Sequence, residues 1–331
     1  MDEIAFHVPR FRVRRLPAPE LRKDPIVERW TIISTDRLGR PQEVHAEMPP
    51  TRLETCPFCA GHEHLTPHAI AELRDERGWR VRVVPNMYPA LRPIDGAAHG
   101  GHEVVIDCPQ HEPSLANLPT DQFVFLLRAY QQRVVAARQD PRLVYPMIFK
   151  NAGADAGASL EHAHSQIVLL PRLPTVLCDE IAAGVAHQAA TGRCIFCDLM
   201  ENERKVGERI ILESGRFVAL AAYAGRFPLE SWILPKAHAS HFESISNEEI
   251  DDLANLFRQL LRKLTAGLDD PPYNYFIQTG PLTDSAMAHY HWHIELLPRI
   301  TGIAGFEIGA GFAINPVPPE QAAAYLREVQ C

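Results

Sequence analysis

The chain has 331 residues, 46% of them hydrophobic, and carries a net charge of −8. This length and composition support a sizeable core and indicate two domains. The acidic balance argues against a general nucleic-acid binder, and no apolar run approaches the roughly 20 residues needed to cross a bilayer.

The N-terminus lacks the apolar segment of a signal peptide, so the sequence predicts a soluble cytoplasmic protein without a membrane partner. Seven cysteines are an odd number for a disulfide scaffold, and four of them form two Cys-x-x-Cys pairs. In a reducing compartment this pattern favours metal binding over disulfides.

Along the chain, the same order of elements occurs twice. A Pro-rich opening segment is expected to pack along the first half. Each half then reads as a Cys-x-x-Cys turn, several strands, a histidine, a long helix and a His-bearing strand. The strands before the helices are expected at 102–107 and 231–236, and the helices at 120–139 and 246–264. The second helix opens with a capping box of Ser246 and Glu249. We therefore predict a duplicated α+β protein.

A constant offset of 127 residues relates HSQIVLLPR, from His164, to HWHIELLPR, from His291. The offset also maps His111 onto His238, and it selects His238 over His241. It maps His162 onto His289.

Each Cys-x-x-Cys supplies two thiolates, and tetrahedral zinc needs two further ligands, for which histidine is the usual choice. His62 or His64 could take the place of His111, and spacing does not decide between His291 and His289. A thioredoxin-like redox pair would not explain the repeated histidines. The predicted ligands are Cys56, Cys59, His111 and His162 in the first half, and Cys194, Cys197, His238 and His291 (or His289) in the second.

The stretch EHAHSQ places His162, His164 and Gln166 two residues apart, which puts them on one face of a strand. If His162 binds metal, His164 remains beside a fixed site. A neutral imidazole is a competent nucleophile toward phosphorus, and Gln166 can donate its amide hydrogens to a phosphate oxygen. The preceding residues Asn151, Gly157 and Ser159 suit a close approach by phosphate.

These motifs resemble the galactose-1-phosphate uridylyltransferases, a branch of the histidine-triad superfamily, over most of the chain. The segment at 20–41 resembles the arginine loop, which implies that Arg37 and Arg40 contact substrate phosphates. VVPNMYPAL at 83–91 resembles the nucleotide-contacting segment, with Asn86 as its asparagine. In NAGADAGASLEHAHSQ the resemblance makes His164 the nucleophile and Gln166 the holder of the transferred phosphoryl group.

The resemblance is not uniform. Ala163 stands where many members have proline, and some members build the second metal site from histidines and a glutamate. The second Cys-x-x-Cys, with segments 270–281 and 305–317, is more similar to ADP-glucose phosphorylase. That resemblance implies His291 as the fourth ligand of the second site. The two thiolates there favour zinc over iron.

We therefore expect an α+β fold of two tandem histidine-triad-like halves, 1–175 and 190–331, each an antiparallel sheet with packed helices and a zinc site. The expected partners are a sugar nucleotide and a sugar 1-phosphate or phosphate, in galactose and carbohydrate metabolism, and the family implies a homodimer.

The expected activity is ping-pong uridylyl transfer between UDP-glucose and hexose 1-phosphate through a nucleotidyl-His164 intermediate. Adenylyl transfer to phosphate is the first alternative and a histidine-triad nucleotide hydrolase the second. A zinc-ribbon-like binding module is a third possibility, which the acidic charge disfavours.

Overall fold

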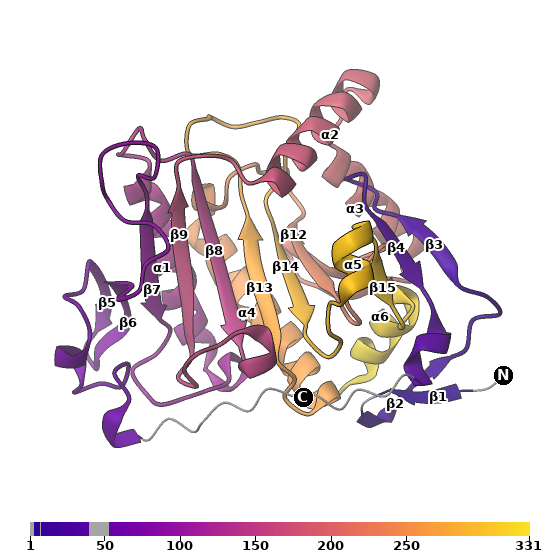
Figure 1. Ribbon diagram of the computed structural model, residues 1–331, viewed down its shortest axis with the longest axis horizontal. Coiled ribbons are helices and arrows are strands. Elements are labelled where there is room, and N and C mark those ends of the chain that lie inside the picture. The colour runs from indigo at the N-terminus through magenta and orange to yellow at the C-terminus, as the bar shows by residue number, and fades with distance from the viewer. Residues whose placement is uncertain (1–2, 7, 40–52) are drawn as a thin grey trace.

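The computed structural model describes residues 3–6, 8–39 and 53–331, and its centre is one ten-stranded antiparallel sheet (Figure 1). Five strands come from each half of the chain. The first half contributes β5 (Ala71–Asp75), β6 (Gly78–Pro85), β7 (Gly101–Ile106), β8 (Tyr145–Ala152) and β9 (His164–Leu170). The second contributes β10 (Ile210–Glu213), β11 (Phe217–Ala221), β12 (Ser231–Pro235), β13 (Tyr273–Gln278) and β14 (His293–Pro298).

The strand order shows the duplication that the sequence predicts. The first half runs β8-β9-β7-β6-β5 from the centre outward, and the second runs β13-β14-β12-β11-β10. The halves join where β8 pairs with β13, with Phe149 opposite Phe276. The predicted α+β fold of antiparallel halves is confirmed, and the two half-sheets form one continuous sheet.

Two long helices pack against each other behind the sheet in Figure 1. They are α1 (Thr120–Ala137) and α4 (Asn247–Leu268), both predicted from their apolar spacing. Their buried faces meet through Phe123 and Phe257, whose ring centroids lie 5.9 Å apart. The capping box at Ser246 and Glu249 is present, so the start of α4 is stabilised as the sequence predicts.

The opening segment packs against the end of the chain, so its predicted placement along the first half is wrong. Strand β4 (Trp30–Ile33) lies between β3 (Glu20–Lys23) and β15 (Ala313–Asn315). Arg22 forms an ion pair with Glu320, at 2.9 Å. The ends of the chain therefore close on each other, because a parallel pairing with β15 satisfies the edge of β4.

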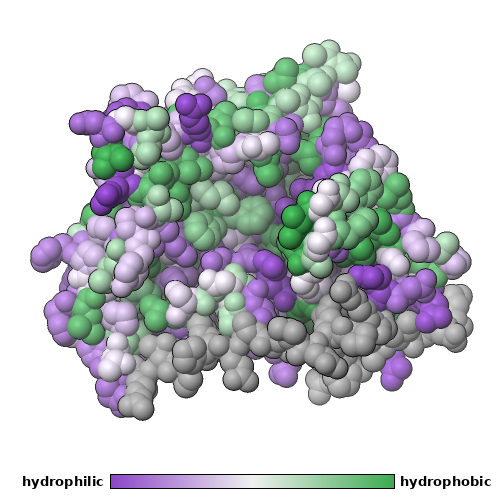
Figure 2. All heavy atoms as spheres, viewed as in Figure 1, coloured by the Kyte–Doolittle hydropathy of each residue, from purple (hydrophilic) through white to green (hydrophobic). Residues whose placement is uncertain are grey.

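The remaining elements lie around this frame. They are β1 (Glu3–Phe6), β2 (Val8–Arg14), α2 (Thr175–Thr191), α3 (Ile195–Val206), α5 (Gly305–Ala310) and α6 (Pro319–Glu328). Figure 2 shows hydrophobic residues gathered over α2 and α5, where Val185 and Ile308 are exposed. Among the helices of the described chain, none is long and apolar enough to cross a membrane.

Candidate active site and metal centres

The first Cys-x-x-Cys pair lies in a tight turn, in which the Cys59 N–H donates to the Cys56 carbonyl over 3.4 Å. The turn faces two histidines from distant parts of the chain. Cys56 Sγ lies 3.4 Å from His162 Nδ1, and Cys59 Sγ lies 3.5 Å from His111 Nδ1. The four ligand atoms all lie within 4.8 Å of one another, so the predicted first set is brought together.

The second Cys-x-x-Cys pair occupies the start of α3, with Cys194 as its N-cap, where the sequence suggested a turn. Cys197 Sγ lies 3.4 Å from His238 Nδ1 and 3.5 Å from His291 Nδ1. These ligand atoms, with that of Cys194, again lie within 4.8 Å of one another.

The structure brings His291, rather than His289, to the other three ligand atoms of the second cluster. Strand β14 begins at His293, so His289 lies in a turn before it rather than on a strand face. The register implied by the 127-residue offset is therefore wrong here. His162 corresponds to His291, because each lies two residues before the first residue of its strand.

The clusters share the same hydrogen bonding behind the ligands. His162 Nε2 donates to the Cys108 carbonyl over 2.9 Å, and His291 Nε2 donates to the Pro235 carbonyl over 3.0 Å. His238 Nε2 donates to the Met287 carbonyl over 3.0 Å. Each bond fixes the tautomer that leaves the Nδ1 lone pair facing the thiolates, as a metal ligand requires.

Two thiolates and two imidazoles form a closed tetrahedral set typical of structural zinc. Both clusters therefore fit zinc by their donor chemistry. The Cys108 thiol lies 3.9 Å from His162 Nε2, the ring nitrogen that faces away from the two thiolates, so it is outside the first ligand set. Burial raises the pKa of this thiol to about 12.

His164 opens β9, beside the first cluster, and is held in one orientation. Its Nδ1–H donates to the His162 carbonyl over 2.8 Å, so Nε2 carries the free lone pair. Burial lowers the pKa of His164, and the nearby Lys150 ammonium lowers it further. The imidazole is thereby kept neutral, as a nucleophile must be.

A buried network supports the strand beneath His164. Lys150 Nζ donates to the His164 carbonyl over 2.8 Å and to Asp107 over 2.7 Å. The other Asp107 oxygen accepts from Ser165 Oγ over 2.7 Å, and Ser165 Oγ accepts from Tyr130 over 2.6 Å. Every polar group in this chain of bonds is satisfied, which fixes the backbone that presents the imidazole.

His164 lines a cavity of about 380 Å³ together with three other predicted site residues, Asn86, Ser159 and Gln166. The rest of the wall is largely apolar and includes Pro57, Phe58, Leu65, Pro67, Val84, Met87, Tyr88 and Leu160. A largely apolar cleft with a few convergent polar groups is typical of a small-ligand site.

The predicted substrate ligands Asn151, Gly157 and Arg37 do not line this cavity. Asn151 donates to the Gly157 carbonyl over 3.3 Å, and its own oxygen accepts from Asn274 over 2.8 Å, so it ties the loop to the second half. Gly157 adopts φ +87°, which explains glycine there. Arg37 is exposed in the turn Thr35–Gly39, and Arg40 lies outside the described residues.

Sequence reasoning did not single out His102, which contacts Gln166. Its Nε2 lies 2.7 Å from Gln166 Oε1. The sequence has no local signal for this contact, because it depends on the pairing of β7 with β9. Val104 pairs with Gln166, and His102 lies two residues away on the same face.

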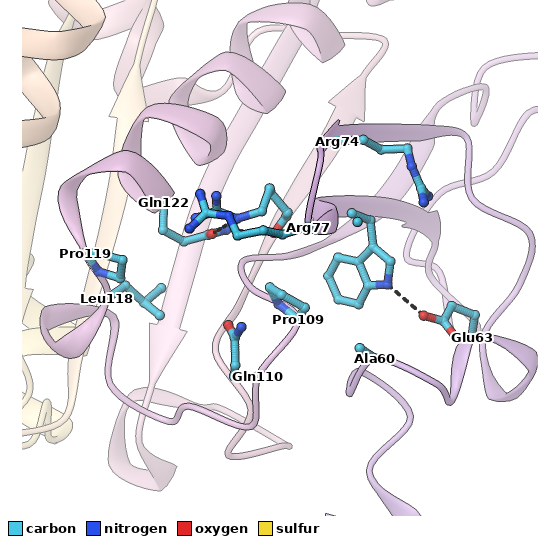
Figure 3. Close-up of a pocket in the computed structure, with 12 residues that line it drawn as sticks. Ala60, Glu63, Arg74, Arg77, Pro109, Gln110, Leu118, Pro119 and Gln122 are labelled. Atoms are coloured by element: carbon cyan, nitrogen blue, oxygen red, sulfur yellow. Dashed lines mark hydrogen bonds between the residues drawn. The ribbon is translucent and has the colours of Figure 1, made fainter.

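A larger cavity of about 540 Å³ lies beyond the first Cys-x-x-Cys turn and is shown in Figure 3. Its guanidinium groups are engaged by carboxylates: Arg77 contacts Asp75 at 2.9 Å, and Arg80 contacts Asp75 at 2.6 Å and Asp121 at 3.1 Å. This cavity contains none of the predicted site residues and offers no unpaired charge for phosphate from Arg77 or Arg80.

Comparisons with known proteins agree with this fold. Residues 121–328 match the family model "Domain of unknown function (DUF4921)". The chain is 37% identical to ADP-glucose phosphorylase from Arabidopsis thaliana, over 94% of this chain and 93% of that protein. It is 30% identical to galactose-1-phosphate uridylyltransferase from Thermotoga maritima, over 94% and 98% of the two chains.

Solved structures show the same relationship. An ADP-glucose phosphorylase from Arabidopsis thaliana with bound ADP-glucose superposes with a TM-score of 0.85 and 36% identity, covering 95% of this chain and all of the other. A uridylyltransferase superposes with a TM-score of 0.75 and 27% identity, covering 94% and 98%. These relatives define a class of nucleotidyltransferases. The chain belongs to the family of galactose-1-phosphate uridylyltransferases and ADP-glucose phosphorylases in the histidine-triad superfamily, and it is an enzyme of that class.

Proposed function

We propose that the protein transfers a nucleotidyl group from a sugar nucleotide through a covalent intermediate on His164. The Nε2 lone pair attacks the α-phosphorus, and the bond from that phosphorus to the bridging oxygen breaks. Sugar 1-phosphate leaves with the electron pair. Phosphate or a second sugar 1-phosphate then attacks the same phosphorus and releases Nε2.

The observation that carries this proposal is the orientation of His164. The Nδ1–H stays bonded to the His162 carbonyl throughout, so attack by Nε2 needs no proton transfer. A sugar 1-phosphate leaves as a stabilised anion and needs little help from an acid.

Charge on the phosphoryl oxygens would be stabilised by the polar groups of the cavity. The Gln166 amide and the Ser159 hydroxyl are the nearest candidates, since both line the cavity with His164. By the family resemblance we also propose phosphate contacts for Arg37 and Arg40, and roles for Asn151 and Gly157 in shaping the phosphate loop.

The two clusters would each hold one zinc ion, which supplies a rigid crosslink rather than chemistry. In the first half, Cys56, Cys59, His111 and His162 would be the ligands. Fixing His162 also fixes the carbonyl that orients His164. The second set is Cys194, Cys197, His238 and His291.

We propose ADP-glucose as the donor and inorganic phosphate as the acceptor, which gives ADP and glucose 1-phosphate. The sequence-based expectation is uridylyl transfer, with adenylyl transfer to phosphate as its first alternative, so the preference between the two reactions is reversed here. It is supported by 37% identity to an ADP-glucose phosphorylase, against 30% to a uridylyltransferase. Transfer from UDP-glucose to a hexose 1-phosphate is the second candidate, favoured by the latter relative.

The homodimer implied by the family is part of the proposal. Arg37 does not line the cavity of its own chain, and exposed apolar side chains gather over α2 and α5. Light scattering at micromolar concentration tests it: a mass of one chain would contradict it.

The donor is tested by measuring products from ADP-glucose and UDP-glucose separately, each with phosphate or with galactose 1-phosphate. We expect ADP and glucose 1-phosphate from the first donor with phosphate. His164→Gly should abolish the reaction, and His187→Ala, which alters a histidine bonded to Asp198 outside the cavity, should not. Release of nucleoside monophosphate without an acceptor would instead establish a hydrolase.

A further inference from the structure

We propose that His102 is a positioning residue that fixes the amide of Gln166 with its NH2 group toward the cavity. This inference rests on the proposed transfer to His164, in which the Gln166 amide donates a hydrogen bond to a phosphoryl oxygen. His102 lies in β7, next to β9, and its side chain is half-buried on the same face as Gln166.

The tautomer of His102 follows from its neighbours. The backbone N–H of Ala90 points at His102 Nδ1 over 3.1 Å, and an N–H can only donate. Nδ1 must therefore be an acceptor, and the hydrogen of the neutral ring is on Nε2.

The orientation of the Gln166 amide follows in turn. The Nε2–H of His102 needs an acceptor, and Gln166 Oε1 lies 2.7 Å away. The carbonyl end of Gln166 is thereby turned toward β7. Among the described residues, no group accepts from Gln166 Nε2, so its two hydrogens remain for a ligand.

The same histidine contacts the nucleotide segment. Its carbonyl accepts from the Asn86 N–H over 2.8 Å, and the Asn86 amide nitrogen lies 3.2 Å from its Nε2. Asn86 Oδ1 is occupied by the Tyr88 N–H over 2.8 Å, which leaves an NH2 group on this side as well. Both amides thus offer donors rather than acceptors to an incoming phosphate.

Without His102 the Gln166 amide can rotate by half a turn, because its two ends are nearly equal in size. The carbonyl oxygen would then face the phosphoryl oxygens and repel them. His102 therefore acts on the transition state through Gln166, without touching the reacting atoms.

The test compares the rate of nucleotidyl adduct formation in wild type, His102→Ala, His102→Gln and His102→Asn. We expect His102→Ala to lower this rate by about 10- to 100-fold, because a misplaced group near the reaction is costly. The KM should change by less than about 3-fold, since the lost interaction matters mainly in the transition state. Glutamine places an amide N–H near the position of Nε2 and should restore part of the rate, whereas the shorter asparagine should not.

A double-mutant cycle separates positioning from a general structural role. In a Gln166→Ala background, His102→Ala should lower the rate by less than a further ~3-fold, because the residue it positions is already gone. Equal losses in both backgrounds, or no loss in the single variant, would overturn the proposal. His187→Ala serves as the matched histidine control.

Nitrogen NMR of ¹⁵N-histidine-labelled protein tests the orientation without any substrate. The His102 ring, assigned by its loss in His102→Gln, should show the Nε2–H tautomer, and the Nδ1–H tautomer would refute the proposal. If wild type forms no adduct with any sugar nucleotide, the proposed function fails, but the NMR result still decides the positioning of Gln166.

Discussion

Each half of the sheet has a second histidine two residues after the histidine of its Cys/His cluster, and the two second histidines lie in different environments. His164 Nδ1 donates to the carbonyl of His162 in the first Cys/His cluster, and His293 Nδ1 donates likewise to the carbonyl of His291 over 3.1 Å. In the first half the free Nε2 faces an open cavity. In the second, His293 is completely buried, and its Nε2 makes no hydrogen bond within the described part of the chain, with Glu295 Oε1 3.6 Å away.

In the second half, side chains occupy the space around the His293 ring. The His293 ring lies between Phe196 and Trp232, with centroid distances of 4.9 Å and 5.2 Å. Burial opposes charge on this imidazole, but the carboxylates of Glu295 and Glu180 outweigh it and raise the pKa of His293. An imidazole enclosed in this way is out of reach of a phosphate and is unsuited to attack on phosphorus.

The residue two positions on completes the contrast. Gln166 follows His164, and Glu295 follows His293, so an amide that can donate is replaced by a carboxylate. Glu295 forms a buried ion pair with Arg226, which also contacts Glu230 at 2.9 Å. In the proposed mechanism one half uses this backbone arrangement for chemistry, and the other half has packing and charge pairing at the same positions.

The largest effect is expected at His164, the proposed nucleophile, compared with its counterpart His293. His164→Ala should lower turnover by on the order of 10³-fold or more, because the covalent route is lost. His293→Gln should leave turnover of the folded enzyme within about 5-fold, because the residue is remote from the cavity. Steady-state assays at matched folded concentration measure both, and comparable losses would contradict the assignment of one catalytic half.

A second change makes the first half resemble the second. Gln166→Glu should lower turnover by about 10² to 10³-fold, because a donor is lost and a carboxylate faces phosphate. The reciprocal Glu295→Gln should change turnover little. If Gln166→Glu kept full activity, the phosphate role of Gln166 would be wrong.

A third change tests the ion pairs of the second half. Arg226→Met should lower the free energy of unfolding by about 3–5 kcal/mol, because Glu230 and Glu295 are left buried without their partner. Adding Glu295→Gln should recover part of this loss. Urea denaturation followed by circular dichroism measures both, and an unchanged midpoint for Arg226→Met would refute the structural role.

The smallest effect is expected at His289. Cys194→Ser should remove about half of the bound zinc, since one of two closed ligand sets is broken. His289→Ala should leave metal content unchanged and alter stability by less than about 0.5 kcal/mol, because its partly exposed side chain lies in a turn outside the cluster. Elemental analysis of dialysed protein distinguishes the two, and zinc loss in His289→Ala would reopen the ligand choice.

Much of the fold and of the candidate site could be predicted from the sequence, because both depend on local patterns that occur twice in the chain. The helical spacing around Phe123 and Ile250, and the paired cysteines with spaced histidines, predicted the helices and the ligand sets. The register of the second His-bearing strand could not be predicted. The LLPR motifs align at an offset of 127 residues, which maps His162 onto His289 instead of His291. Long-range contacts were also hidden: His102 meets Gln166 only through strand pairing, and Arg22 meets Glu320 only after folding.

The central claim is that one half alone carries the covalent intermediate. The most direct test mixes the protein with ADP-glucose or UDP-glucose, without acceptor, and maps the acid-labile adduct to a peptide by mass spectrometry. The account predicts one nucleoside monophosphate per chain, on the peptide that contains His164, and none in His164→Gly. An adduct on the peptide that contains His291 and His293, or none from either donor in zinc-replete protein, would contradict it.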